Sequence, residues 1–208
     1  MGEILKFPGE ATKLGYRRVR RRGALAADPN QLDFFLPAAA RISNISSGFS
    51  VFEQALLCDE RGDLQAADLY AKAIENDDCV ADAFCNLGII ESKKGNTAKA
   101  FDCFTTSLKH DARHSEAHYN LANLYFEVND FRLAQIHYEI AAEVDPSFAN
   151  VYFNLGLVQS INHELAVAIT TLTKYQQLVT AEEARNADEL LRNLRQSLAA
   201  ANDSRLGS

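Results

Sequence analysis

The sequence predicts an all-α solenoid of about four helix-turn-helix repeats, closed by a C-terminal capping helix. The first observation is a pattern that recurs every 34 residues: Ala134 has counterparts at Ala66, Ala100 and Ala168. The second is that apolar residues within each half of the pattern fall three and four apart, as on one face of an α-helix. A fixed period of this length predicts stacked helix pairs, stabilised by the interfaces between neighbours.

Each repeat also has residues suited to ending its helices. Asn129 lies between the two apolar runs of the unit at 115–148, and Gly95 and Gly62 lie near the matching places upstream. Glycine and asparagine tolerate the left-handed backbone that ends many helices. Pro146 disfavours helix in the residue before it. Each unit is therefore expected to be two short antiparallel helices.

Small and large side chains alternate between the expected helices. Gly88, Ala122 and Gly156 leave room for large side chains of neighbouring helices, such as Phe104 and Tyr138. At these positions the chain resembles the tetratricopeptide repeat family, whose 34-residue motif has small residues, aromatics and a terminal proline in the same places. The resemblance implies a right-handed superhelical solenoid. It covers four units, at residues 47–80, 81–114, 115–148 and 149–182.

The regions outside the repeats differ from them in pattern. Residues 1–46 have no sustained helical period and are expected to be largely irregular, with 31–46 as a possible N-terminal cap. Thr180 and Glu183 form a capping box, the Ser/Thr and Glu pair that satisfies free amides at a helix start. A capping helix is expected over 183–200, followed by a frayed tail at 201–208.

Charge is distributed unevenly along a chain of 208 residues whose net charge is −7. Residues 1–46 carry eight basic and four acidic side chains, and the remainder carries 13 basic and 24 acidic ones. No apolar run approaches the roughly 18 residues that a membrane span needs. The N-terminus lacks the apolar core of a secretory signal. These features predict a cytoplasmic protein with no membrane partner.

The resemblance implies a function as well as a fold. In the tetratricopeptide repeat family, the first helices of successive repeats line a concave groove that binds extended peptides or partner helices. The chain is thus expected to be a non-enzymatic adaptor or scaffold that binds another protein or peptide. The groove residues expected to contact the partner are Asn86, Lys93, Tyr119, Asn120, Asn123, Phe126, Phe153 and Asn154.

Three of these residues, Asn86, Asn120 and Asn154, are one period apart. Stacked in a ladder, their amides could donate to and accept from the main chain of a bound peptide, whatever its sequence. The alternative is that asparagine at this position only suits the packing of the helices. Because the charged groove positions are mostly acidic, with Lys93 the exception, a basic or neutral-polar partner is expected.

The basic N-terminal region leaves two alternatives open. Clustered arginines bind phosphates, so the chain could be a nucleic-acid-associated regulator. The alternative is that the basic segment is a solvated tail with no binding role. Residues 31–36, with sequence QLDFFL, could cap the first repeat or occupy the groove as a built-in, autoinhibitory ligand. The arginines of the nucleic-acid alternative are Arg17, Arg18, Arg20, Arg21 and Arg22.

No motif for catalysis, a cofactor or a metal stands out. The sequence lacks GxGxxG, GxxxxGK[ST], HExxH and GxSxG patterns, and its cysteines never form CxxC. His110, His114 and His118 are four apart, but the period places a turn between them. They are expected to be exposed turn histidines rather than metal ligands. No enzymatic activity and no cofactor are therefore predicted.

Overall fold

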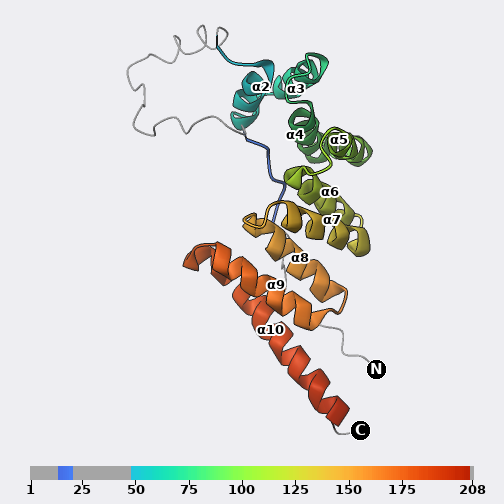
Figure 1. Ribbon diagram of the computed structural model, residues 1–208, viewed down its shortest axis with the longest axis vertical. Helices are drawn as coiled ribbons and strands as arrows, with labels where there is room; N and C mark the ends of the chain where they lie inside the picture. The colour runs from blue at the N-terminus through green and yellow to red at the C-terminus, as the bar shows by residue number, and fades with distance from the viewer. Residues whose placement is uncertain (1–13, 21–47, 207–208) are drawn as a thin grey trace. The chain divides into compact units, whose positions relative to one another are not determined.

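The computed structural model describes residues 14–20 and 48–206, and the regular structure within these ranges is helical. The described chain divides into two compact units (Figure 1). One unit, Arg18–Ala112, contains α2 (Val51–Glu60), α3 (Ala66–Glu75), α4 (Val80–Lys93) and α5 (Thr97–His110). The other unit consists of Met1–Arg17, of which residues 14–17 are described, and Arg113–Ser208. It contains α6 (Ser115–Glu127), α7 (Phe131–Val144), α8 (Ala149–Ile161), α9 (Leu165–Leu178) and α10 (Ala181–Leu206).

The helices form the expected antiparallel pairs, and each pair is joined by the same turn. One residue in each turn has a positive φ, between 62° and 80°, which ends the first helix in the left-handed conformation. The next N–H then bonds back to the first helix, as Asn96 does to the Glu91 carbonyl at 2.9 Å. The left-handed residues are Gly62, Gly95, Asn129 and His163.

Close approach within each pair depends on the small residues of the first helix. A Cβ at Gly88 would lie 2.7 Å from the Phe104 ring, and one at Gly156 would lie 2.6 Å from the Leu172 side chain. Phe104 and Leu172 are fully buried, so neither can move into solvent. The small-against-large pattern in the sequence thus sets the spacing of α4 and α5, and of α8 and α9.

The C-terminal helix differs in length from the sequence-based expectation. It begins at Ala181, where Thr180 and Glu183 form the predicted capping box, and it continues to Leu206. The expected end at residue 200 was therefore too early, because Ala199 to Ala201 favour helix and no glycine or proline intervenes before Gly207. Buried residues of α10, including Leu190 and Leu194, pack with Leu172 and Tyr175 of α9.

The prediction that the three spaced histidines are exposed was wrong for two of them. His114 is fully buried as the N-cap of α6, where its Nδ1 accepts from the Ala117 N–H at 3.2 Å. His118 is 7% exposed, and its Nδ1 lies 2.9 Å from Nδ1 of His137 on α7. That distance requires one ring to donate a proton that the other accepts. Burial, and then His118, lower the pKa of His137 to about 4.

The first prediction concerns packing between α8 and α9. Gly156→Ala should lower the free energy of unfolding by about 1–3 kcal/mol, because the added methyl overpacks the buried contact with Leu172. In a Leu172→Ala background the same change should be neutral or stabilising, since the obstructing atoms are gone and alanine favours helix. Urea unfolding of the four proteins completes the cycle. An equal cost in both backgrounds would contradict this packing account.

The second prediction concerns pH. The folded-state pKa of His137 lies below its unfolded value, so the unfolded chain binds more protons as pH falls from about 6.5 to about 4. Stability should therefore decrease across that window, with a slope of at most about 1.4 kcal/mol per pH unit, the limit for uptake of one proton. His137→Gln should flatten the dependence measured by urea unfolding at pH 7.5, 6 and 5.

The control for this measurement is the exposed residue His110, changed to Gln in the same way. Its variant should keep the pH dependence of the wild-type chain. If His137→Gln also kept it, proton uptake at the His118–His137 pair would not explain the loss of stability.

Candidate functional site

Residues 14–20, which we call the arm, lie against the helices although they form neither helix nor strand. Their main chain is bound by the three periodic asparagines. Leu14 and Arg17 bind within the α6–α10 unit, and Val19 binds within the α2–α5 unit. The described contacts of the arm therefore make two sites, one in each unit.

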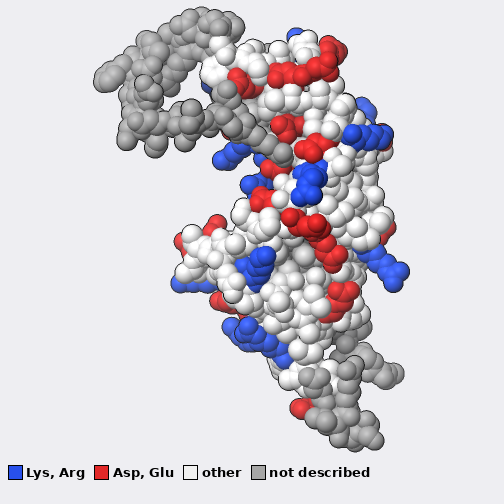
Figure 2. Space-filling model, viewed as in Figure 1, with Lys and Arg blue, Asp and Glu red and all other residues white. Residues whose placement is uncertain are grey.

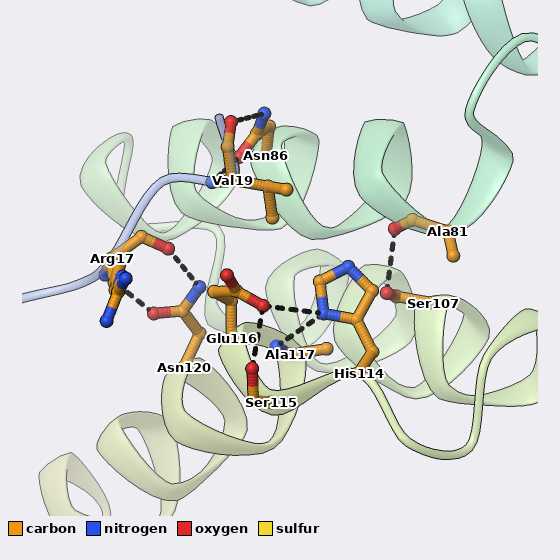
Figure 3. A network of polar contacts seen from close by, with 10 residues as sticks. All are labelled: Arg17, Val19, Ala81, Asn86, Ser107, His114, Ser115, Glu116, Ala117 and Asn120. Carbon is orange, nitrogen blue, oxygen red and sulfur yellow. Dashed lines mark hydrogen bonds and ion pairs between the residues drawn. The ribbon is translucent and has the colours of Figure 1, made fainter. Parts of the chain in front are cut away.

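The site in the α6–α10 unit contains Asn120 of α6 and Asn154 of α8. The Leu14 N–H donates to Oδ1 of Asn154 at 2.7 Å, and Nδ2 of Asn154 donates back to the Leu14 carbonyl at 3.0 Å. Asn120 binds Arg17 in the same two-way manner, with both distances 2.8 Å (Figure 3). Each amide thus satisfies both main-chain groups of one arm residue.

The site in the α2–α5 unit repeats this pairing with Asn86 of α4. The Val19 N–H donates to Oδ1 of Asn86 at 2.8 Å, and Nδ2 donates to the Val19 carbonyl at 3.1 Å (Figure 3). All three asparagine side chains are fully buried. A primary amide offers one acceptor and two donors, so this geometry reads the backbone and is indifferent to the residue that carries it.

Tyrosine hydroxyls hold the asparagines in position. Nδ2 of Asn86 lies 3.2 Å from the Tyr70 hydroxyl of α3. Nδ2 of Asn154 lies 3.3 Å from the Tyr138 hydroxyl and also donates to Oδ1 of Asn123 at 2.9 Å. Burial raises the pKa of Tyr70 and of Tyr138, so both hydroxyls keep their protons and can donate. The amides are therefore preorganised by the second helices of the preceding repeats.

Tyr119 extends the main-chain contacts on α6. Its buried hydroxyl donates to the carbonyls of Leu14 and Gly15, at 3.0 and 2.9 Å. Burial raises its pKa as well, so it remains a donor at neutral pH. The ring packs on Phe148 with the centroids 4.7 Å apart. The α6–α10 site thus binds main-chain groups of Leu14, Gly15 and Arg17 without using a charged side chain.

Side chains of the arm make further contacts within each unit. The Arg18 guanidinium pairs with Asp59 of α2: Nη2 donates to Oδ1 at 2.7 Å, and Nε lies 2.5 Å from Oδ2 as an ion pair without hydrogen-bond geometry. Val19 is fully buried. In the other unit, the Arg17 guanidinium lies 3.9 Å above the Phe148 ring centre, and the Tyr16 hydroxyl donates to Glu127 at 2.8 Å.

Asp59, which binds the Arg18 side chain, also contacts the tyrosine that supports Asn86. The Tyr70 hydroxyl donates to Oδ2 of Asp59 at 3.3 Å and lies beside the Asn86 amide. Burial raises the pKa of the Asp59 carboxyl, whereas Arg18 and Lys93 act in the opposite direction. The Asp59 side chain is only 10% exposed. Its charge is thus removed from water and is balanced chiefly by the arm.

The remaining predicted site residues are placed differently. Asn123 is buried and supports Asn154, and its Nδ2 has no hydrogen-bond partner among the described residues. Phe153 is 4% exposed and meets Tyr175 edge-on, so it belongs to the core. Phe126 packs edge-on with Phe131. Lys93 is exposed, and the arm makes no described contact with it.

The residue types that the prediction missed are Asp59, Phe148 and the two supporting tyrosines. Tyr70 and Tyr138 differ by two periods and could have been paired with the asparagines 16 residues downstream. Asp59 precedes the turn of the first repeat and gave no signal. The segment expected to fill a groove, 31–36, lies outside the described residues, as do Arg21 and Arg22. Arg17 and Arg18 instead contact Phe148 and Asp59.

Within residues 14–20 and 48–206, no three histidine, cysteine, aspartate or glutamate side chains gather as a metal site would require. Across those same ranges, no helix has the length and apolar character needed to cross a membrane.

The sequence matches a known family and a curated relative. Residues 115–148 match the family model described as "Tetratricopeptide repeat". "Tetratricopeptide repeat protein 8" of Mus musculus is 29% identical over 125 residues, which cover 60% of this chain. The match covers only 24% of the mouse protein, so the chain corresponds to about a quarter of that relative's length.

Solved structures share the fold. The first TPR of Spaghetti (RPAP3) bound to the HSP90 peptide SRMEEVD is 24% identical, with a TM-score of 0.53, over 57% of this chain and 93% of that chain. A crystal structure of MamA is 18% identical, with a TM-score of 0.54, over 74% of this chain and 98% of that chain. These matches show one tetratricopeptide repeat at residues 115–148 and a helical-repeat fold shared with the solved structures.

Proposed function

We propose that this protein, a helical interaction module, binds an extended segment of a partner protein through the asparagine sites that hold its own arm. The observation that carries the proposal is the two-way pairing of Asn86, Asn120 and Asn154 with single main-chain residues. Any extended peptide presents the same N–H and carbonyl groups. The arm is then an internal ligand that the partner displaces, and the module acts as an adaptor or scaffold.

Burial of the amides supports a role in binding as well as in packing. A buried polar group without a partner destabilises the protein by about 1–3 kcal/mol. Asn120 and Asn86 direct both functional ends of the amide at the arm, rather than at a neighbouring helix alone. Asparagines needed only for helix packing would have their amides satisfied within the repeats.

The charges around the arm favour a basic or neutral-polar partner. Asp59 and Glu127 are the acidic side chains that the arm contacts. Acidic side chains also form a row over the α2–α3 part of the face in view (Figure 2). The HSP90 peptide in the neighbouring RPAP3 structure is acidic at its end, SRMEEVD. Such a sequence would place like charges together here, so a different class of peptide is expected.

The third prediction tests the proposal with full-length variants used as baits in the source lysate. Val19→Asp should release the arm, because a fully buried valine cannot be replaced by a carboxylate without a large cost. The released chain should capture a partner several-fold more strongly than the wild type does. Adding the changes Asn86→Ala, Asn120→Ala and Asn154→Ala should reduce that capture by at least about tenfold, since three paired hydrogen-bond sites are lost.

The matched control is Asn186→Ala, an exposed asparagine on α10, in the same Val19→Asp background. It should capture as strongly as Val19→Asp alone, and circular dichroism should show that all baits remain helical. Equal capture by the triple asparagine variant would refute the proposal and move the interaction to another surface.

A further inference from the structure

We propose that the binding site is selective, and that it recognises a partner segment carrying arginine followed by an aliphatic residue, as in Arg18-Val19. This inference rests on the proposed function, because it names the side chains that a displacing partner must supply. It also commits to a partner protein as the occupant, rather than nucleic acid or a second copy of the chain.

Arginine is favoured at the first position by the geometry of Asp59. Both carboxylate oxygens face the guanidinium, at 2.7 Å from Nη2 and 2.5 Å from Nε. The Nη2 contact is a hydrogen bond and the Nε contact is an ion pair without hydrogen-bond geometry. Two nitrogens placed against two oxygens still suit the planar guanidinium better than the single ammonium of lysine. Because the Asp59 side chain is 10% exposed, a ligand without a cation here would leave a largely buried charge unpaired.

An uncharged side chain is required at the second position. Val19 is fully buried, while its N–H and carbonyl are both held by Asn86. The fixed backbone prevents a polar side chain at this position from turning outward to water. Aspartate, glutamate or lysine would therefore have to be buried without a partner, which is unfavourable.

These two contacts also fix the register of the bound segment. Asparagine amides alone accept any residue, so a peptide could shift along them without losing hydrogen bonds. Asn86 and Asp59 are linked through the Tyr70 hydroxyl, which lies 3.2 Å from the amide and 3.3 Å from the carboxylate. One residue's backbone and the preceding residue's side chain are thus recognised together. Arg17, which is exposed above Phe148, contributes less to the choice.

The fourth prediction uses fluorescent peptides with the sequence of residues 13–20, KLGYRRVR, and the full-length Val19→Asp protein. The native peptide should bind to it. Peptides with Arg18→Glu or Val19→Asp should bind at least about tenfold more weakly, because each leaves a buried charge unpaired. The matched control is Arg20→Glu, the same charge change at an exposed residue, which should weaken binding by less than about threefold.

A charge exchange separates direct pairing from general electrostatics. Asp59→Arg in the protein should abolish the preference for the native peptide and should improve binding of the Arg18→Glu peptide. Arg18→Lys should bind more weakly than the native peptide, because a single ammonium cannot place two nitrogens against both carboxylate oxygens. Equal binding of the Arg18→Glu and Arg20→Glu peptides, which have the same net charge, would overturn the selectivity proposal.

The outcomes distinguish this proposal from the proposed function. Equal binding of the Arg18→Glu, Val19→Asp and native peptides, all lost in the triple asparagine variant, would overturn the selectivity and leave the binding function standing. Rapid trypsin cleavage after Arg17 in the Val19→Asp protein would show that its arm is released. If a protein with a released arm bound none of the peptides, both proposals would be overturned. A dimer of the wild type that Val19→Asp dissociates would make a second copy the occupant and would also overturn the selectivity proposal.

Discussion

The pairing between buried asparagine amides and an extended main chain is the constraint on which this site depends. Asn86, Asn120 and Asn154 are fully buried, and each exchanges two hydrogen bonds with one arm residue. Without an occupant these amides would need water or would lose those bonds, at a cost that repeats at every site. The asparagine sites therefore fit an extended segment, and in this structure the arm satisfies their amides.

The repeat provides this arrangement with few residue types. Gly88 and Gly156 allow close packing within a helix pair. A tyrosine on the second helix of one repeat supports the asparagine on the first helix of the next, as Tyr70 supports Asn86 and Tyr138 supports Asn154. At the position between them the sequence has Phe104, which carries no hydroxyl. The packing and binding functions of the repeat are thus combined in one period.

The sequence predicted the part of this structure that periodicity encodes. Residue size and spacing indicated the helix pairs, and the recurrence of asparagine suggested a ladder that binds main chain. The identity of the occupant could not be predicted in the same way, because a ligand held by its backbone needs no characteristic side chains. The sequence analysis proposed the apolar run at 31–36 as the built-in ligand, and it did not consider the arginine-rich segment for that role. Asp59 was missed because its role depends on a residue 41 positions away.

In the proposed function, displacement of the arm and selection of a partner would depend on the same few atoms. A segment tethered to its site competes at an effective concentration of the order of millimolar, so a weak or generic peptide would not displace it. The main-chain hydrogen bonds do not help a partner to compete, because they are equal for the arm and for any other extended segment. The difference in binding free energy must come from side chains, and hence from the contacts at Asp59 and at the buried position of Val19. Under this proposal, the arm would therefore set both the affinity threshold and the sequence that a partner has to match.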